Sequence, residues 1–315
     1  MIVALEHGMV TSELDDAASV FLSVRSRLFG IAYRMLGSAN EAEDLVQETW
    51  IRWQGTDRST VLDPAAFLAT ITIRLALNMA QSARARRETY IGPWLPEPVD
   101  TRDDPYLGAE RGEALSLAVL ILLDKLSPAE RAAYVLREAF DYPYSRIAEL
   151  LESTEVNARQ IVSRARRHVA DGVRASAQPV EPEEQGKLLE AFMRAARKGE
   201  IAELEGLFAE GVVSTTDGNG VVNAARKPVD GREKVAKFIA SFAWHFWADA
   251  TFALVEANGR PGLLVSRNGE VYVFAAVEMS DEGIEEIHWV MNPEKLARIA
   301  KSWPKPGDTA SLLQH

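Results

Sequence analysis

A group of arginine, glutamine and asparagine side chains near residue 160 has the chemistry needed to read a nucleic acid. An Arg guanidinium or a Gln amide can form two parallel hydrogen bonds with the edge of one base, and further arginines bind phosphates. The side chains recur every three to four residues, so they share one side of a helix. The group consists of Asn157, Arg159, Gln160, Ser163, Arg164 and Arg167.

The residues around this group predict two helices joined by a short turn. An apolar face at 145–151 defines the first helix, the turn follows at 152–154, and Thr154 is a suitable N-cap for the second helix. The apolar stripe of the second helix faces away from the arginines. That stripe consists of Ala158, Ile161, Val162, Ala165 and Val169. Segment 144–174 therefore predicts a helix-turn-helix that enters a major groove; a solvated amphipathic helix in an ordinary bundle is the alternative.

The charge of the chain is distributed unevenly. The 315 residues carry a net charge of −11, whereas residues 156–174 alone carry +4. Any contact with nucleic acid is therefore expected to be local, because the acidic remainder repels phosphate. The length suggests two or three domains.

The sequence lacks the features of several protein classes. It has no cysteine, no apolar run of about 20 residues and no basic start followed by an apolar block. It also has no His-x-x-x-His pair and no glycine-rich phosphate loop between a strand and a helix. We expect a cytoplasmic protein without membrane contact, metal site or cofactor.

Apolar periodicity predicts a small helical domain at residues 1–87. Its first helix ends at Gly37, and the second carries acids in its first turn, as the positive end of the helix dipole prefers. The third begins at Asp63 and Pro64, an N-cap followed by proline at the first helical position. The expected inner stripe of the third helix is Leu68, Ile71, Leu75 and Met79.

A linker follows at residues 88–113, with four prolines and seven acids. Trp94 and Leu95 are unusually apolar for a solvated linker and predict that it docks on another part of the chain. Helical periodicity resumes over a second domain at 114–174, which a second linker follows at 175–185.

Residues 186–300 predict an α+β domain, because two amphipathic helices are followed by strand-like segments. A helix is expected at 230–247, and residues 301–315 form a tail. The expected strands, mostly antiparallel, are 212–216, 251–257, 262–267, 270–277 and 284–290. The predicted fold is therefore multidomain, with two all-α domains and one α+β domain.

Segments 39–53, 63–87 and 126–167, in this order, resemble the extracytoplasmic-function (ECF) class of bacterial RNA polymerase sigma factors. They are similar to conserved regions 2 and 4 of that class. The sequence WLPEP at 94–98, the α+β extension and the segment Asn292-Pro293-Glu294-Lys295-Leu296 resemble the SigJ-like subgroup, which carries a C-terminal SnoaL-like (NTF2-like) domain.

The resemblance implies that the second helix binds the β′ clamp of core RNA polymerase. Asp44, Gln47 and Glu48 would form a polar rim, and Leu45 and Trp53 an apolar anchor. In the alternative interpretation, Trp50 and Trp53 are part of the core and the acids are a solvated helix cap.

The third helix would face the promoter −10 element, where a base leaves the stack beside the loop at 54–63. Asn78 occupies the position of the family's base-reading asparagine. An ordinary polar helix surface is the alternative. The residues implied for this contact are Arg74, Asn78, Gln81, Arg84, Arg86 and Arg87.

In the helix-turn-helix, the resemblance makes Arg159 and Gln160 the expected readers of the −35 element, with Ser163 close by, while Arg164, Arg166 and Arg167 hold the DNA backbone. The implied partners are core RNA polymerase, through its β′ clamp and β flap, and promoter DNA. The C-terminal domain would modulate activity by packing on the sigma domains. The interdomain residues are Trp94, Leu95, Pro96, Asp217, Asn292, Pro293, Lys295 and Leu296.

NTF2-like folds form a cone whose mouth often holds a small molecule, so a ligand in this domain is a further implied partner. His245 or His288 could then act as a general base, although packing of the cone is the favoured role and no enzymatic activity is expected. The polar and aromatic candidates for lining the cone are Asp217, Trp244, His245, Trp247, His288 and Trp289. The rival hypothesis is a DNA-binding small-molecule sensor whose NTF2-like domain binds a ligand or retains enzymatic activity.

Overall fold

The computed structural model of the chain describes residues 2–101, 116–172, 180–302 and 312–313, apart from Asn223, His245 and Ala248. These residues form two compact units. The helical unit comprises residues 2–86 and 122–169. The C-terminal unit comprises 87–101, 116–121 and the described residues from 170 onward. The first part of the expected linker, 88–101, therefore packs with the C-terminal residues.

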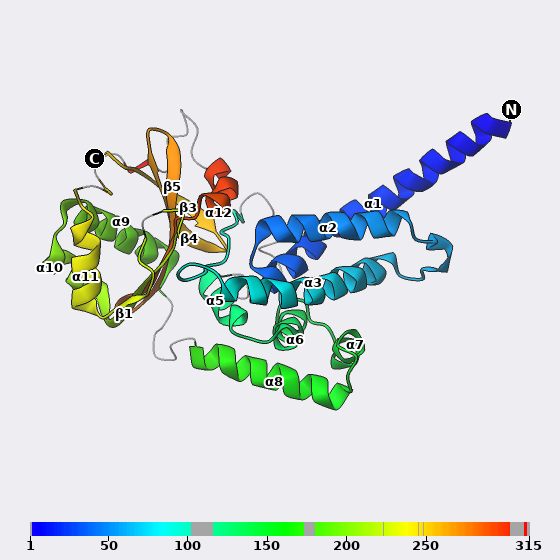
Figure 1. Cartoon of the computed structure of the whole chain (residues 1–315), viewed down its shortest axis with the longest axis horizontal. Helices are drawn as coiled ribbons and strands as arrows, with labels where there is room; N and C mark the ends of the chain where they lie inside the picture. Colours follow the sequence, from blue (N-terminus) through cyan, green and yellow to red (C-terminus); the bar gives the residue numbers. More distant parts are fainter. Residues whose placement is uncertain are drawn as a thin grey trace. The chain divides into compact units, whose positions relative to one another are not determined.

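The helical unit begins with three helices, α1 (Ile2–Leu36), α2 (Ala39–Gln54) and α3 (Pro64–Glu88), drawn in blue and cyan in Figure 1. A short 3-10 helix, η1 (Arg58–Thr60), lies in the loop before α3. The side chain of Ser38 accepts a hydrogen bond from the Glu41 amide, and Asp63 Oδ1 accepts one from the Ala66 amide. Both predicted helix starts are confirmed, since these caps satisfy amides that the helix itself leaves unpaired.

The buried face of α3 differs from the predicted stripe. Leu68 is fully buried, but Ile71, Leu75 and Met79 are only partly buried. The hydroxyls of Thr49 on α2 and Thr72 on α3 lie 3.2 Å apart, so α3 approaches its neighbour too closely for bulky side chains between them. The buried positions are mostly small for this reason: Leu68, Ala69, Thr72, Ile73, Ala76, Ala80 and Ala83.

The rest of the helical unit contains the helix-turn-helix. Helix α5 (Leu117–Asp124) leads into α6 (Pro128–Glu138), whose start is fixed by a capping box in which Ser127 and Glu130 bond each other's backbone amides. Helices α7 (Tyr144–Leu150) and α8 (Glu155–Gly172) follow, joined by a turn. The Thr154 hydroxyl accepts a hydrogen bond from the Asn157 amide, which confirms the predicted N-cap. The predicted apolar stripe of α8 is buried throughout.

A buried arginine joins the two halves of the helical unit. Arg131 on α6 donates from Nε to the backbone carbonyl of Arg34 at the end of α1 (2.9 Å) and forms an ion pair with Asp124 (3.1 Å). Burial lowers the pKa of Arg131 to about 10, so the side chain stays charged at neutral pH. Arg146 on α7 adds a hydrogen bond to the Thr70 hydroxyl on α3 (2.6 Å).

The C-terminal unit is built on a seven-stranded sheet of order β2-β1-β6-β5-β4-β3-β7. The pairing of β1 with β6 is parallel and the other pairings are antiparallel, which confirms the mostly antiparallel expectation. The strands are β1 (Phe208–Asp217), β2 (Val229–Asp230), β3 (Thr251–Ala257), β4 (Arg260–Arg267), β5 (Glu270–Ser280), β6 (Gly283–Val290) and β7 (Leu312–Leu313).

Helices cover the two faces of this sheet differently. Helices α9 (Pro182–Lys198), α10 (Ile201–Leu207) and α11 (Arg232–Ser241) lie on one face, and α12 (Pro293–Ile299) on the other (Figure 1). A 3-10 turn, η3 (Ala300–Ser302), follows α12. The helix expected at 230–247 is shorter than predicted, because the described residues after Ser241 form turns in which aromatic side chains pack against one another.

Each face of the sheet has its own apolar core. The core under α9–α11 includes Phe192 and Trp289, while the opposite core brings Leu95 of the linker against Leu296 of α12. Strand alternation separates the two sets of side chains. No helix in the described ranges is long and apolar enough to span a membrane.

Candidate functional site

The exposed face of α2 is a candidate protein-binding surface. Asp44 and Gln47 are exposed, and Glu48 is partly exposed and forms a hydrogen bond with Arg52 (2.8 Å). These positions are three and four residues apart, so they lie on one side of the helix. Ile51 continues the same face and is 60% exposed. Sequence periodicity alone did not single out Ile51.

Leu45 and Trp53, predicted as the apolar anchor of this surface, are both 1% exposed. The Trp53 indole donates a hydrogen bond to the Ala17 carbonyl of α1 (3.0 Å), and its ring packs near Phe67 of α3. In this structure both side chains form part of the core of the helical unit. The apolar group that α2 presents to solvent is therefore Ile51, and the burial of Trp53 is what the alternative interpretation, a tryptophan in the core, describes.

The polar face of α3 lies opposite its core stripe. Arg74, Asn78 and Gln81 are exposed along it, and Arg84 is exposed near its end. Arg86 forms an ion pair with Glu41 of α2. Arg87, also implied for the −10 contact, has its guanidinium 3.6 Å from the centre of the Trp94 ring within the C-terminal unit.

A hollow of about 480 Å3 lies beside the loop that precedes α3. Trp53 and Asp57 contribute to its wall, and Asp57 caps η1 by accepting hydrogen bonds from the amide and hydroxyl of Ser59. These hydrogen bonds lower the pKa of Asp57. Asn78 is not among the lining residues, since it lies 14 positions, or about 21 Å of helix, beyond Pro64.

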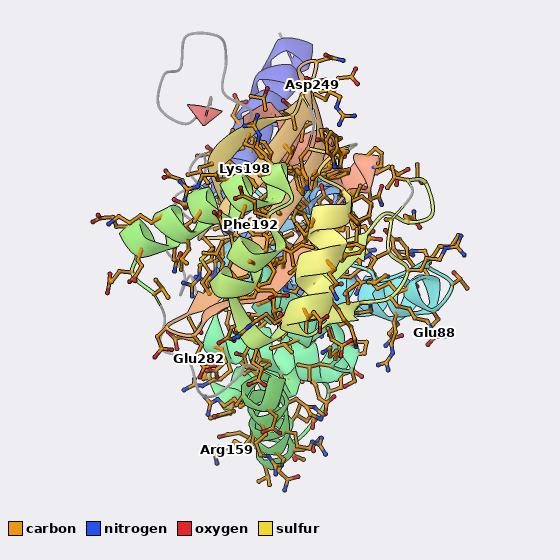
Figure 2. The ribbon with its side chains drawn as sticks, turned by 90° about the vertical axis from the view of Figure 1, so that its left-hand side faces the viewer. Glu88, Arg159, Phe192, Lys198, Asp249 and Glu282 are labelled. Atoms are coloured by element: carbon orange, nitrogen blue, oxygen red, sulfur yellow. The ribbon has the colours of Figure 1, made fainter. Side chains whose placement is uncertain are left out.

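The recognition face of α8 is fully solvent-accessible. Asn157, Arg159, Gln160, Ser163, Arg164 and Arg167 are all exposed. Figure 2 shows Arg159 at the outer side of α8, where it pairs with Glu155 and lies over the Tyr144 ring of α7. Arg166, by contrast, is tied to Glu138 of α6 (2.7 Å), which raises its pKa and holds α8 on α6.

A buried polar cluster fixes the linker to the C-terminal sheet, and we call it the linker hub. It consists of Tyr90, Leu95, Asp217, Asn292 and Lys295. Asp217 lies at the end of β1 and is 0% exposed. Its Oδ1 accepts a hydrogen bond from the Tyr90 hydroxyl (2.5 Å), and its Oδ2 accepts from the Leu95 amide (2.8 Å) and Lys295 Nζ (2.6 Å).

Lys295 and Asn292 bring the start of α12 into the hub. Lys295 Nζ also donates to the Leu95 carbonyl (2.5 Å) and lies 4.3 Å from the centre of the Trp94 ring. Asn292 caps α12 through its Oδ1 and donates from Nδ2 to the Tyr90 hydroxyl (3.1 Å). The predicted interdomain residues Trp94, Leu95, Asp217, Asn292 and Lys295 therefore meet within one unit. Sequence reasoning missed Tyr90, whose only signal was its position before WLPEP.

Burial sets the protonation of the hub. Burial lowers the pKa of Lys295 to about 8, while the Asp217 carboxylate opposes that shift. Burial, together with the hydrogen bond to Asp217, raises the pKa of Tyr90. At neutral pH the Lys295 amine is therefore still protonated and the Tyr90 hydroxyl is neutral.

The linker continues from the hub along the end of the β3–β4 hairpin. Val99 and Asn258 exchange hydrogen bonds: the Asn258 amide donates to the Val99 carbonyl (2.9 Å), and the Val99 amide donates to Asn258 Oδ1 (3.2 Å). The Thr101 hydroxyl donates to Glu256 (2.8 Å). Pro96 and Leu296 are buried beside this path, whereas Pro293 is an exposed first residue of α12.

The proposed cone-lining residues do not all meet. Trp247 and Trp289 lie on the helix-covered face, with ring centres 5.7 Å apart, and both line a cavity there. Asp217 and His288 point to the opposite face, where His288 lies 3.0 Å from Glu286. His288 is thus not placed to act as a base in that cavity. Trp244 is 84% exposed, and His245 lies outside the described residues. No group of acidic or histidine side chains able to hold a metal ion occurs in the described residues.

These features agree with the comparison to known proteins. The model of sigma-70 region 2 matches residues 20–86, and that of sigma-70 region 4 matches residues 116–169. Similarity to an ECF RNA polymerase sigma factor extends over 82% of this chain at 38% identity. The chain therefore belongs to the ECF RNA polymerase sigma factors, which direct promoter-specific transcription initiation.

The relative with 38% identity is ECF sigma factor SigJ of Mycobacterium tuberculosis, of which 80% is covered. A protein described as probable ECF sigma factor SigI of the same organism is 30% identical over 90% of this chain and 96% of its own length. The crystal structure of M. tuberculosis SigJ matches with a TM-score of 0.71 at 30% identity, over 89% of this chain and 98% of that one. The predicted fold class, two helical sigma regions followed by an α+β domain, is confirmed.

Removing one partner of the Asp217–Lys295 pair should destabilise the protein strongly. Lys295→Met leaves a buried carboxylate without its counter-charge, and Asp217→Asn leaves a buried amine, so each should cost about 3–5 kcal/mol. The double variant should cost less than the sum of the two. Urea denaturation measures the free energy of unfolding of the two single variants and of the double variant. Lys237→Met, which breaks an exposed pair with Glu233, is the control and should leave the midpoint unchanged; strictly additive effects at Asp217 and Lys295 would contradict the pairing.

Proposed function

We propose that the chain binds core RNA polymerase through the exposed face of α2 and places α8 on the −35 element. The observation that carries this proposal is the fully exposed polar face of α8, which a capped helix-turn-helix supports from behind. Gln160 and Arg159 are the proposed base-reading residues, and Arg164 and Arg167 suit phosphates. The β′ clamp and the β flap are the proposed polymerase contacts. The protein acts where the polymerase is, in the cytoplasm.

The −10 element is assigned to the polar face of α3 together with the hollow beside η1. A single unstacked base fits a hollow of about 480 Å3 that an aromatic side chain, Trp53, helps to line. Arg74, Asn78 and Gln81 then follow the strand along α3, with Arg84 on phosphate. Arg86 and Arg87 are already engaged with Glu41 and Trp94 and support the helix end.

Substitutions on α8 should separate base reading from backbone binding in run-off transcription with core polymerase. Gln160→Ala and Arg159→Ala should each weaken binding to the preferred −35 sequence by about 1–3 kcal/mol and should relax the base preference at the contacted position. Arg164→Ala should weaken all promoters alike and lower the salt dependence of binding. Lys187→Ala on α9 is the control. Failure of the wild-type chain to give any promoter-dependent transcript from an ECF promoter library would exclude the proposed function.

Two substitutions on α2 should distinguish a residue of the proposed polymerase-binding surface from a residue in the core of the helical unit. Ile51→Ala should weaken binding to core polymerase by about 1 kcal/mol or more, because it removes an exposed apolar contact, and should leave stability nearly unchanged. Leu45→Ala should lower the free energy of unfolding by about 2–5 kcal/mol because it opens a cavity, with little effect on the affinity of the folded molecules. Fluorescence anisotropy measures the affinity for core polymerase, and urea denaturation measures the free energy of unfolding. The reverse pattern would show that Leu45 is the anchor after all.

We further propose that the C-terminal unit modulates sigma activity by holding the linker. The hub and the hydrogen bonds of Val99 and Thr101 fix residues 90–101 on the sheet. A linker held in this way is not available to run through the polymerase between the two sigma regions. In this proposal the unit restrains initiation without chemistry of its own.

Small-molecule binding is a second candidate function of the C-terminal unit, and it would accompany promoter recognition instead of replacing it. One observation favours it: the aromatic cavity between the sheet and α11 is lined by Trp247 and Trp289. The family membership of the whole chain argues against a free-standing sensor.

Loosening the hub should raise transcription. Tyr90→Phe removes one hydrogen bond to Asp217 and should increase run-off product modestly, and Lys295→Met should increase it further in the fraction that remains folded. Output is measured per folded molecule at equal core polymerase. Glu270→Gln, at an exposed position on β5, is the control. Unchanged output in both hub variants would exclude modulation through the linker.

A further inference from the structure

The first turn of α8 presents an apolar side chain to solvent within its polar face. Val156 is 64% exposed, and it is the one large apolar side chain exposed on α8, a helix that the structure describes in full. Single exposed apolar residues are common on protein surfaces and need no special role. Val156 differs from them in its position, its neighbours and its effect on the helix, which together indicate a contact outside the chain.

Val156 lies opposite the buried side of its helix. With about 100° between successive residues, Val156, Gln160 and Arg167 fall within about 40° of arc, and the buried stripe centres on the far side. Val156 is the member of this row nearest to the N-terminus of α8. In a helix-turn-helix, the N-terminal residues of the second helix are those that contact base edges. Val156 therefore occupies a base-reading position of the exposed face.

The polar side chains on either side of Val156 are engaged within the helix-turn-helix. The Arg159 guanidinium lies over the ring of Tyr144 on α7, 5.3 Å from its centre. Asn157 donates a hydrogen bond from Nδ2 to the Ser153 hydroxyl in the preceding turn (2.7 Å). Val156 thus lies along the middle of the face, between two side chains that other groups of the same motif hold.

Val156 does not favour the helix that carries it. A β-branched side chain is a weaker helix former than alanine, because it loses rotamer freedom against the preceding turn. The first turn of a helix favours small polar and acidic side chains, such as those of Thr154 and Glu155. At 64% exposure, Val156 also buries little of its own surface. Stability therefore does not explain a valine here, and such departures are expected at functional positions.

We propose that Val156 determines specificity within the −35 element by contacting the 5-methyl group of a thymine in the major groove. The proposal rests on the placement of α8 on that element proposed above. In the major groove the bases present hydrogen-bond donors and acceptors, and thymine alone adds a methyl group. An isopropyl side chain forms no hydrogen bonds, so the thymine methyl is the group on a base edge that it binds favourably.

The spacing along α8 places this thymine close to the base that Gln160 reads. Val156 precedes Gln160 by four residues, or about 6 Å of helix, and successive base pairs are about 3.4 Å apart. The two side chains therefore reach base pairs at most two steps apart. A valine in a helix occupies mainly one rotamer. Its methyl groups are positioned before DNA binds, and little side-chain entropy is lost on contact.

The test removes a methyl group from the DNA side of the contact. The −35 sequence preferred by the full-length chain with core polymerase is first selected from a promoter library randomised over that element. Each thymine of either strand is then replaced singly by deoxyuridine, which lacks only the 5-methyl group. Binding to each duplex is measured by fluorescence anisotropy. At one thymine, deoxyuridine should weaken binding about three- to five-fold, as expected for the loss of one buried methyl group.

Substitution of Val156 removes methyl groups from the protein side. Val156→Ala should weaken binding to the thymine promoter by a similar factor and should abolish the response to deoxyuridine at that one position. Val156→Thr keeps one of the two methyl groups and should respond less than the wild type does. Neither variant should alter the preference at the base read by Gln160. Thermal unfolding should show Val156→Ala to be at least as stable as the wild type, because alanine is the better helix former.

A matched control lies at the start of α10. Ile201 is an apolar residue in the first turn of that helix and is 39% exposed. Ile201→Ala should bind the thymine promoter with wild-type affinity and should keep the full response to deoxyuridine. A general effect of removing an exposed apolar side chain is thereby separated from an effect at the DNA.

The outcomes are distinct. If no single deoxyuridine weakens binding of the wild type, or if Val156→Ala keeps the wild-type response at every position, the assigned contact is wrong although α8 still reads the −35 element. If selection yields no preferred −35 sequence at all, and Gln160→Ala transcribes every promoter as the wild type does, the placement of α8 on that element is wrong, and the contact is excluded with it.

Discussion

The C-terminal unit depends on one buried ion pair, between Asp217 and Lys295. Its two charges lie 2.6 Å apart, with the carboxylate fully buried. Such a pair has a large desolvation penalty, and it persists only where further hydrogen bonds satisfy its atoms. Tyr90 and the backbone of Leu95 supply them. The pair therefore fixes the linker, the end of β1 and the start of α12 together.

The fold follows largely from local signals. Ser38, Asp63, Ser127 and Thr154 all cap helices as their sequence contexts predict, because a cap depends on only three or four consecutive residues. The stripe of α3 was predicted wrongly, since hydrophobicity favours bulky residues and cannot show that a neighbouring helix approaches closely enough to require alanine and threonine.

The candidate sites, like the fold, were predictable where the signal is local and were not predictable where it depends on residues far apart in the chain. The exposed arginines of α8 follow from periodicity, because the buried stripe fixes which side remains outside. On α2, the family resemblance implied Leu45 and Trp53 as the anchor, yet the tertiary packing buries both and leaves Ile51 exposed. Tyr90 could not be found from sequence, since its partner Asp217 is 127 residues away. Long-range polar pairs have no local pattern.

The separation of the hub residues along the chain has a consequence for synthesis on the ribosome. The Leu95 carbonyl accepts its hydrogen bond from Lys295, 200 residues later. At about 5–20 residues per second, the linker waits about 10–40 s after its own translation before this partner exists. Before the end of that interval both sigma regions have been made, while Leu95 still lacks its partner Lys295. A newly made molecule therefore passes through a stage with an uncovered linker, and the contacts that hold the linker form only after both sigma regions have been made.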